Sequence, residues 1–338
     1  MSYKRWTMVL VTCVLALGLT AGQAYAGNVP NKRHVAKRPV AAKTFNARAA
    51  MILAADKYFT DSPSPVISAP VLNAALQAKD TSYQIVDVRA ASDYARGHID
   101  GAINIPFTTI ADDANVAKLD PTKTIVTVCY TGETASMTNM VWSMMGYRVT
   151  TLMYGMTGWS TDKDVVGMDI PTGKAAGYAT TTRPTKAHKT FRAPKLNGKY
   201  ADLASAVKGQ AKAYFAKGLS PIITASDVHK IVATHNTRQY QIVSVRQKAD
   251  YATGHIKGAI NIVWTNIADS TRKLDPKKTT VVYCYTGNTG AQASMFLNLM
   301  GYKTYNMMSG MASWNTDPAV GGFVGYDPAL IANYPIIK

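Results

Sequence analysis

Residues 125–132 read Ile-Val-Thr-Val-Cys-Tyr-Thr-Gly, and residues 280–287 read Thr-Val-Val-Tyr-Cys-Tyr-Thr-Gly. In both stretches a short run of apolar and β-branched residues, typical of a buried strand, ends at a cysteine. A helix-like stretch follows, from Ala135 to Met145 and from Ala291 to Met300, and a glycine stops each one. The pattern predicts a cysteine between a strand and a helix, twice in one chain.

The two stretches belong to a long internal repeat. Residues 86–89, 93–95, 97–99 and 101–105 recur, with few changes, 157 residues later, and residues 119–121, 129–132 and 146–147 recur 155 residues later. Residues 85–88 and 242–245 also have the composition of buried strands. The sequence therefore predicts two copies of one α/β domain, each a mostly parallel β-sheet flanked by helices.

The formal charge of +17 is unevenly distributed along the 338 residues. Residues 27–55 contain six basic residues and 171–200 contain seven, and neither segment contains an acid. We interpret them as a basic N-terminal segment and a basic linker, around copy one (residues 56–170) and copy two (residues 201–338). Copy one has 8 basic and 13 acidic residues, and copy two has 14 and 7.

The two basic segments are expected to be flexible and solvated. The alternative is contact with an anionic surface or an acidic partner. Nucleic acid is not an expected partner, because no base-reading module is visible.

Residues 1–26 are interpreted as a signal peptide. Lys4 and Arg5 precede an uncharged stretch from Trp6 to Ala21, and Ala24-Tyr25-Ala26 is a typical cleavage site. Cleavage after Ala26 would place the protein in the periplasm or outside the cell, with an uncleaved membrane anchor as the alternative. It would leave two cysteines, too few for a disulfide scaffold.

Cys129 and Cys284 are the candidate catalytic residues. A glycine-containing loop before a helix can turn its N–H groups toward the sulfur, and the helix adds its positive dipole end. We expect these groups to lower the pKa of each thiol and favour a nucleophilic thiolate; two inert core cysteines are the alternative. The expected substrate-binding residues are Tyr130, Thr131, Gly132, Glu133, Thr134 and Ala135 in copy one, and Tyr285, Thr286, Gly287, Asn288, Thr289 and Gly290 in copy two.

Together these motifs resemble the rhodanese family of sulfurtransferases, in tandem. The resemblance rests on residues 87–89, 93–94 and 97–106, on the loop from Cys129 to Thr134, and on Gly155 with Trp159; copy two repeats the series up to Gly310 and Trp314. It implies a parallel five-stranded sheet in each copy and a cysteine that carries a sulfane sulfur as a persulfide. The donor would be a small sulfur anion such as thiosulfate, or a persulfide, and the acceptor cyanide, a thiol or a protein. Neither a metal nor an organic cofactor is implied.

The loops also depart from the family pattern. Neither contains the Arg or Lys that often attracts thiosulfate, and copy one has Glu133, the only glutamate in the chain. We expect this carboxylate at the rim of the Cys129 site, where it would repel an anionic donor, and therefore expect Cys284 to react faster with thiosulfate. Phosphatase or arsenate reductase chemistry is not expected, because Ala135 and Gly290 stand where those enzymes of the same fold have an arginine.

Other polar residues are expected to have structural roles. His98 and His255 lie in Gly-His-Ile segments remote in sequence from the cysteines. Asp87, Arg89 and Arg246 are expected to be salt-bridged framework residues, with substrate contact as the alternative, although Ser244 deprives Arg246 of the aspartate that Asp87 offers Arg89. Two function classes remain open: an exported sulfurtransferase, and a module that carries or senses sulfane sulfur or selenium, or docks to a partner protein, without turnover.

Overall fold

The computed structural model describes residues 45–61, 65–168, 175–186, 190–321 and 332–338. The predicted signal peptide and most of the predicted basic N-terminal segment lie outside these residues. Both copies of the repeat belong to one compact unit, Thr44–Lys338. Among the described residues, no helix has the length and apolar character needed to cross a membrane.

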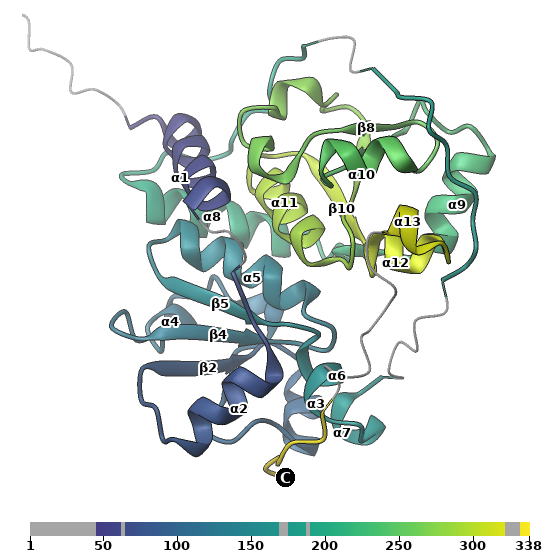
Figure 1. The fold of residues 1–338 in the computed structure, drawn as a ribbon. Helices are drawn as coiled ribbons and strands as arrows, with labels where there is room; N and C mark the ends of the chain where they lie inside the picture. The colour runs from purple at the N-terminus through teal and green to yellow at the C-terminus, as the bar shows by residue number, and fades with distance from the viewer. Residues whose placement is uncertain (1–44, 62–64, 169–174, 187–189, 322–331) are drawn as a thin grey trace, which may run out of the picture. The chain divides into compact units, whose positions relative to one another are not determined.

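Copy one contains a five-stranded parallel sheet with the strand order β1-β5-β4-β2-β3, and helices flank it (Figure 1). Its strands are β1 (Val66–Ile67), β2 (Tyr83–Asp87), β3 (Ile103–Asn104), β4 (Thr124–Val128) and β5 (Arg148–Leu152). Its helices are α2 (Ala69–Gln77), α3 (Ala91–Arg96), η1 (Phe107–Thr109, 3-10), α4 (Asp113–Val116), α5 (Glu133–Met144), α6 (Gly155–Trp159) and α7 (Lys163–Val166).

Copy two has the same topology, with the strand order β6-β10-β9-β7-β8. Its strands are β6 (Ile222–Ile223), β7 (Tyr240–Ser244), β8 (Ala259–Asn261), β9 (Thr279–Tyr283) and β10 (Lys303–Met307). Its helices are α9 (Ala225–Ala233), α10 (Lys248–Thr253), η2 (Trp264–Asn266, 3-10), η3 (Thr271–Lys273, 3-10), α11 (Asn288–Leu299), α12 (Gly310–Trp314) and α13 (Pro318–Gly321). The predicted fold class is confirmed, and each cysteine follows the central strand of its sheet.

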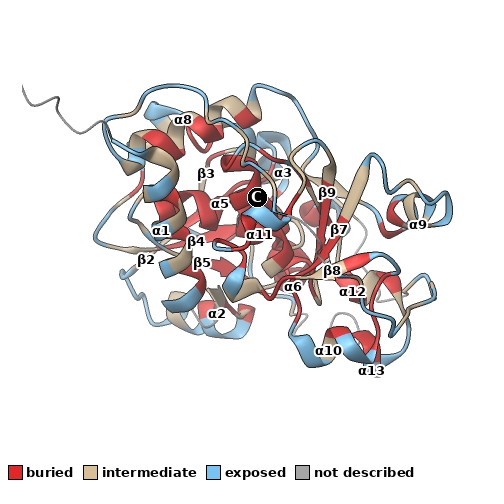
Figure 2. Ribbon diagram, turned by 90° about the horizontal axis from the view of Figure 1, so that it is seen from above, coloured by how far each residue is buried: buried red, intermediate tan, exposed pale blue. Residues whose placement is uncertain are grey.

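The helices that follow the cysteines are buried nearly all round. Most residues of α5 and α11 are inaccessible to solvent (Figure 2), and the two helices contact each other. Each helix packs on the sheet of its own copy as well as on the other helix, which buries polar and apolar side chains alike. One hydrophobic cluster accordingly contains both cysteines and residues of both copies.

The first helix of each copy crosses to the other copy. α1 (Ala47–Asp61) leads into copy one, yet Phe59 packs edge-on against Trp264 and Phe296 of copy two, with ring centroids 5.1 and 5.8 Å apart. α8 (Leu203–Phe215) begins copy two, yet Phe215 packs edge-on against Phe107 of copy one at 5.0 Å. Each leading helix therefore contributes to the core of the other copy.

The segments that trail each copy are exchanged in the same way. Residues 175–186 follow copy one but lie along copy two, where Trp314 Nε1 donates to the Ala179 carbonyl at 3.1 Å and Thr181 bridges to His255. Residues 332–338 end copy two but lie along copy one, where Trp159 Nε1 donates to the Pro335 carbonyl at 3.0 Å and Ile337 bridges to His98. The two copies therefore exchange both a leading helix and a trailing segment.

These contacts correct two expectations. The described parts of the predicted linker make backbone hydrogen bonds with copy two, for example from Tyr178 N to the Trp314 carbonyl at 2.9 Å, where solvated chain is expected. The predicted basic N-terminal segment, also expected to be solvated, contains residues 47–55 of α1. Both features depend on burial against a distant part of the chain, which local composition does not report.

Candidate active site

Cys129 lies directly after β4, and the sulfur is surrounded by hydrogen-bond donors. The Gly132 N–H donates to Sγ at 3.1 Å, and the N–H groups of Thr131 and Ala135 and the hydroxyl of Thr134 also bond it. Only 1% of the residue is exposed. The arrangement suits a negative charge on or next to the sulfur, as the sequence predicts.

Cys284 occupies the equivalent position after β9. The Gly287 N–H donates to Sγ at 3.1 Å, the same distance as in copy one. This residue is also only 1% exposed, and neither cysteine is in a disulfide. The two copies therefore place a cysteine at the same position, with the equivalent glycine N–H donated to its sulfur.

Close backbone contacts hold each cysteine loop in place. Met156 N donates to the Cys129 carbonyl at 2.7 Å, and Met311 N to the Cys284 carbonyl at 2.9 Å. A β-carbon on Gly155 would overlap the Cys129 carbonyl, and one on Gly310 would lie 2.5 Å from the Cys284 carbonyl. Glycine is therefore required where α6 and α12 begin, which explains the recurrence of Gly155 and Gly310 in the sequence motif.

The expectation of a lowered thiol pKa is wrong for Cys129. Burial raises its pKa, and the hydrogen bonds from Thr134, Ala135, Thr131 and Gly132 only partly offset this effect. The desolvation of the buried sulfur outweighs the effect of the donors on the pKa. The sequence motif indicates the donors but not the extent of this burial.

Tyr130 and Tyr285 anchor the loops rather than leaving their hydroxyls free for a substrate. The Tyr130 hydroxyl donates to the Asp93 carboxylate and accepts from Ala90 N at 3.3 Å. The Tyr285 hydroxyl donates to the Asp250 carboxylate. Burial is the main cause that raises the pKa of both tyrosines to about 12. Sequence reasoning missed the two aspartates as loop anchors, although the repeated Asp-Tyr-Ala motif contains them.

Glu133 is not at the rim of the Cys129 site but buried between the two cysteine loops, with 3% of its surface exposed. Its carboxylate accepts from Ser309 N at 2.7 Å, from Asn306 Nδ2 at 3.3 Å and from the Thr131 hydroxyl at 3.0 Å. Burial raises its pKa to about 7, against the opposing effect of these donors. The side chain thus ties the loop of copy one to copy two.

The contact between the loops is reciprocal. A β-carbon on Gly287 would overlap the Glu133 carboxylate, and one on Gly132 would lie 3.0 Å from Asn288 Oδ1. Glu133 and Asn288 are equivalent residues of the two copies. Glu133 lies against Gly287, which donates to the Cys284 sulfur, and Asn288 lies against Gly132, which donates to the Cys129 sulfur. The expected repulsion by Glu133 therefore concerns the loop of Cys284 at least as much as that of Cys129.

The arginine of the first strand motif is buried in both copies, but only Arg89 has an acidic partner. It forms an ion pair with Asp87 at 2.6 Å and donates to the carbonyls of Val165 and Gly97 at 2.6 and 2.7 Å. Arg246 donates to the corresponding carbonyls of Val320 and Gly254 at 2.8 and 2.5 Å. The expected framework role is supported for both, while the expected salt bridge of Arg246 is absent from the described residues.

The two histidines have structural contacts, as the sequence predicts. His98 stacks on Tyr94 and His255 on Tyr251, with ring centroids 3.8 and 3.6 Å apart. His255 is also held by the carbonyls of Tyr251 and Arg183. Burial lowers the pKa of His255, which favours its neutral form.

The cysteine loops are shorter than predicted. α5 begins at Glu133 and α11 at Asn288, because Gly132 and Gly287 adopt left-handed φ angles of 91° and 100° that lead directly into the helices. The residues expected in the later part of each loop therefore form the first helical turn. Their N–H groups lack partners within the helix and are available to the sulfur.

Comparison with known families assigns the chain. Residues 68–162 and 224–317 each match the rhodanese-like domain. The chain belongs to the rhodanese-like family. The first match contains Cys129 and the second contains Cys284. The duplication deduced from the sequence is therefore a duplication of the rhodanese-like domain.

Rhodanese-like relatives cover one copy at a time. The chain is 36% identical over 76 residues to the thiosulfate sulfurtransferase GlpE of Pseudomonas fluorescens, covering 22% of this chain and 70% of that protein. It is 29% identical over 89 residues to GlpE of Shewanella oneidensis, covering 26% and 88%. These matches support a sulfurtransferase family for this chain.

Among solved structures, a thiosulfate sulfurtransferase from Pseudomonas aeruginosa matches 77% of this chain and 46% of its own, at 15% identity and a TM-score of 0.31. The BH2092 protein of Bacillus halodurans matches 36% of this chain and 95% of its own, at 21% identity and a TM-score of 0.29.

Among the described residues, no cluster of His, Cys, Asp or Glu is arranged to hold a metal ion.

Proposed function

We propose that this protein is a sulfurtransferase that carries a sulfane sulfur on Cys129, Cys284 or both. The observation that carries the proposal is a cysteine at the carboxyl end of the central strand in each copy, with a glycine N–H donated to each sulfur and three further donors to that of Cys129. Such donors would stabilise the extra negative charge of a cysteine persulfide. The names of the GlpE relatives add support for thiosulfate as donor.

The reaction would proceed by two displacements. The cysteine thiolate attacks the outer sulfur of thiosulfate, the S–S bond of the donor breaks, and sulfite leaves with the bonding electron pair. A nucleophile such as cyanide or a thiolate then attacks the outer sulfur of Cys–S–S⁻. The Sγ–S bond breaks, and the cysteine thiolate returns. Both cysteines are buried, so the loops must open for the donor to enter.

Intact-mass analysis tests this function. The protein is treated with thiosulfate or polysulfide, its mass is measured, and cyanide is then added. We expect a gain of sulfur that cyanide removes with release of thiocyanate, and no gain in a Cys129→Ser/Cys284→Ser variant. A wild-type protein that gains no cyanide-labile sulfur would contradict the proposal.

The second candidate is a module that holds sulfane sulfur, or selenium, or docks to a partner, without turnover. It is favoured by the burial of both cysteines and by the absence of Lys and Arg from the cysteine loops. Multiple turnovers with thiosulfate and cyanide separate the two: an enzyme releases many thiocyanate ions per protein, whereas a carrier releases no more than two.

Export is part of the proposal. The sequence features of residues 1–26 support a signal peptide and a periplasmic or secreted protein. N-terminal sequencing of the protein isolated from its own cells is expected to begin at Gly27. A sequence beginning at Met1 or Ser2 would show that the segment is retained.

A further inference from the structure

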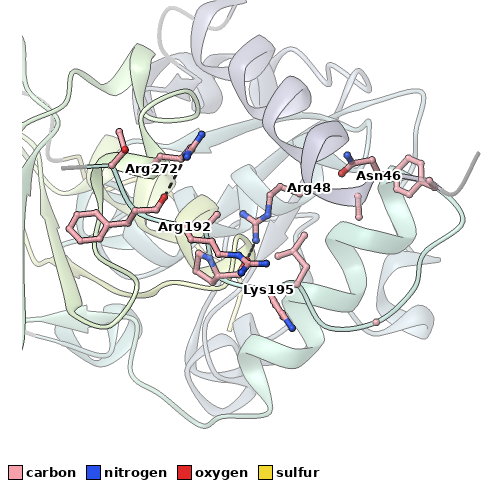
Figure 3. A pocket seen from close by; sticks show the side chains of 13 residues that line it. Asn46, Arg48, Arg192, Lys195 and Arg272 are labelled. Carbon is pink, nitrogen blue, oxygen red and sulfur yellow. Dashed lines mark hydrogen bonds between the residues drawn. The ribbon is translucent and has the colours of Figure 1, made fainter.

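A groove that contains neither cysteine is formed where two basic segments of the chain meet. The beginning of α1 and residues 190–198 of the linker form most of it, and η3 completes it (Figure 3). Its volume is about 830 Å³. Four cationic side chains from these three segments line it: Arg48, Arg192, Lys195 and Arg272.

The positive charge of this groove is uncompensated within the described residues. None of its lining residues is acidic, and none of the four cations forms an ion pair with a described residue. Like charges brought together in this way repel one another, and an anion would relieve the repulsion.

Arg48 provides a second observation. Its Nη2 donates to the carbonyls of Pro194 and Met300, which fixes the guanidinium between α1 and the linker. Its Nη1 is buried and has no hydrogen-bond partner among the described residues. Figure 3 shows this side chain extending from α1 toward the linker residues. The guanidinium therefore supplies a fixed positive charge beside the groove, with no acidic partner among the described residues.

We propose that this groove binds phosphorylated ligands that carry more than one phosphate group. Three of the four cations are arginines, whose planar fork matches phosphate oxygens better than the point charge of lysine does. The groove is much larger than a single tetrahedral anion and falls in the range of organic ligand sites. Cations on three separate segments suit a ligand with several separated charges. A free oligophosphate and the headgroups of anionic lipids share this chemistry.

Calorimetric titration of the full chain with inorganic triphosphate tests the site. The test variant is Arg192→Gln/Lys195→Gln, because both side chains are exposed and their loss leaves the buried contacts intact. We expect it to weaken binding at least about tenfold, since two charge-assisted contacts are lost. Binding by the wild-type protein should also weaken steeply with added salt.

Two matched variants remove the same charge elsewhere. Lys217→Gln/Lys277→Gln changes two exposed lysines outside the groove, and Lys37→Gln/Arg38→Gln changes the basic N-terminal segment. Both should bind triphosphate nearly as the wild-type protein does. The proposal is overturned if either control loses as much affinity as the groove variant, or if the groove variant binds as tightly as the wild-type protein.

Vesicles distinguish the two sources of phosphate. Sedimentation with phosphatidylglycerol vesicles, against phosphatidylcholine vesicles, is measured for the same variants. Groove-dependent binding to the anionic vesicles identifies lipid headgroups as a source, and groove-dependent binding to triphosphate alone identifies free oligophosphates. Groove-dependent binding to neither ligand overturns the proposal. The measurement involves no sulfur chemistry, so it stands or falls independently of the sulfurtransferase function.

Discussion

In copy one the buried guanidinium of Arg89 faces the carboxylate of Asp87, whereas in copy two that of Arg246 lies near the rings of Tyr283 and Tyr285, 5.7 and 5.9 Å from their centroids. Each arginine donates to two backbone carbonyls of its own copy, and these carbonyls are equivalent in the two copies. The difference teaches that the carbonyl contacts define the framework, while the partner of the charge can be an acid or a pair of aromatic faces.

The largest expected effect concerns the two sulfurs. Each single Cys→Ser variant should load one sulfur at most, and the double variant none. We expect Cys129→Ser, which reports on Cys284, to react with thiosulfate about tenfold faster than Cys284→Ser, because the basic surplus of copy two attracts the dianion. Rapid-quench mass analysis measures both rates. Equal rates would show that the charge of the surrounding copy is irrelevant.

The next prediction removes the acidic partner that distinguishes Arg89 from Arg246. Asp87→Ser gives copy one the serine that copy two has at this position, Ser244. Copy one still lacks the aromatic ring of Tyr283, because the equivalent residue is Val128. It leaves Arg89 buried without an acid, and we expect the free energy of unfolding to fall by about 3–5 kcal/mol. The matched variant Ser244→Ala should change it by less than about 1 kcal/mol, because the Ser244 hydroxyl is uncharged and its removal breaks no ion pair. Urea unfolding of the two variants gives both values; similar losses would refute the comparison.

Glu133 gives copy one a pH dependence that Asn288 cannot give copy two. Its folded pKa of about 7 lies above the ordinary value of 4.5, so the folded state favours the protonated carboxyl and is destabilised as pH rises from about 4.5 through 7. The cost of ionisation above pH 7 is about 3 kcal/mol. We expect Glu133→Gln to be more stable than the wild-type protein at pH 8, by up to this amount, and similar to it at pH 4.5. A difference that does not change with pH would contradict the raised pKa.

The smallest effect sharpens the comparison of the loop glycines. An alanine at either Gly132 or Gly287 must adopt a left-handed φ, which costs about 1–2 kcal/mol. Gly287→Ala should cost more than Gly132→Ala, because its methyl group would overlap the Glu133 carboxylate. Glu133→Ala should remove this excess, as a double-mutant cycle of unfolding free energies can show. An unchanged excess would mean that the loops are not in contact.

The sequence sufficed for the features that depend on local pattern. The apolar runs before Cys129 and Cys284 identified the central strands, and the repeat identified two copies of one sheet. The donors around the sulfur followed from the glycine and the helix after each cysteine. These features need only neighbouring residues, which the printed order provides.

What could not be predicted depends on contacts between distant residues. Glu133 was placed at a rim because nothing in its neighbourhood reveals Ser309, 176 residues later, as the donor to its carboxylate. The same limitation explains the wrong pKa direction for Cys129, since its desolvation depends on burial by elements remote in sequence. One local feature does mark Glu133 as a special position: it is the only glutamate of the chain, and copy two has Asn288 at the equivalent position.

The exchanged helices and trailing segments make each copy dependent on the other for part of its core. Neither copy supplies its own covering elements: Trp159 needs Pro335, and Trp314 needs Ala179. If one copy of this chain were separated from the other, it would lose these contacts, and exchange of the same elements with a second molecule would restore them at a cost that depends on protein concentration. Joining the two copies in one chain makes the trade intramolecular, so a dilute protein retains both cysteine loops in their mutual contact.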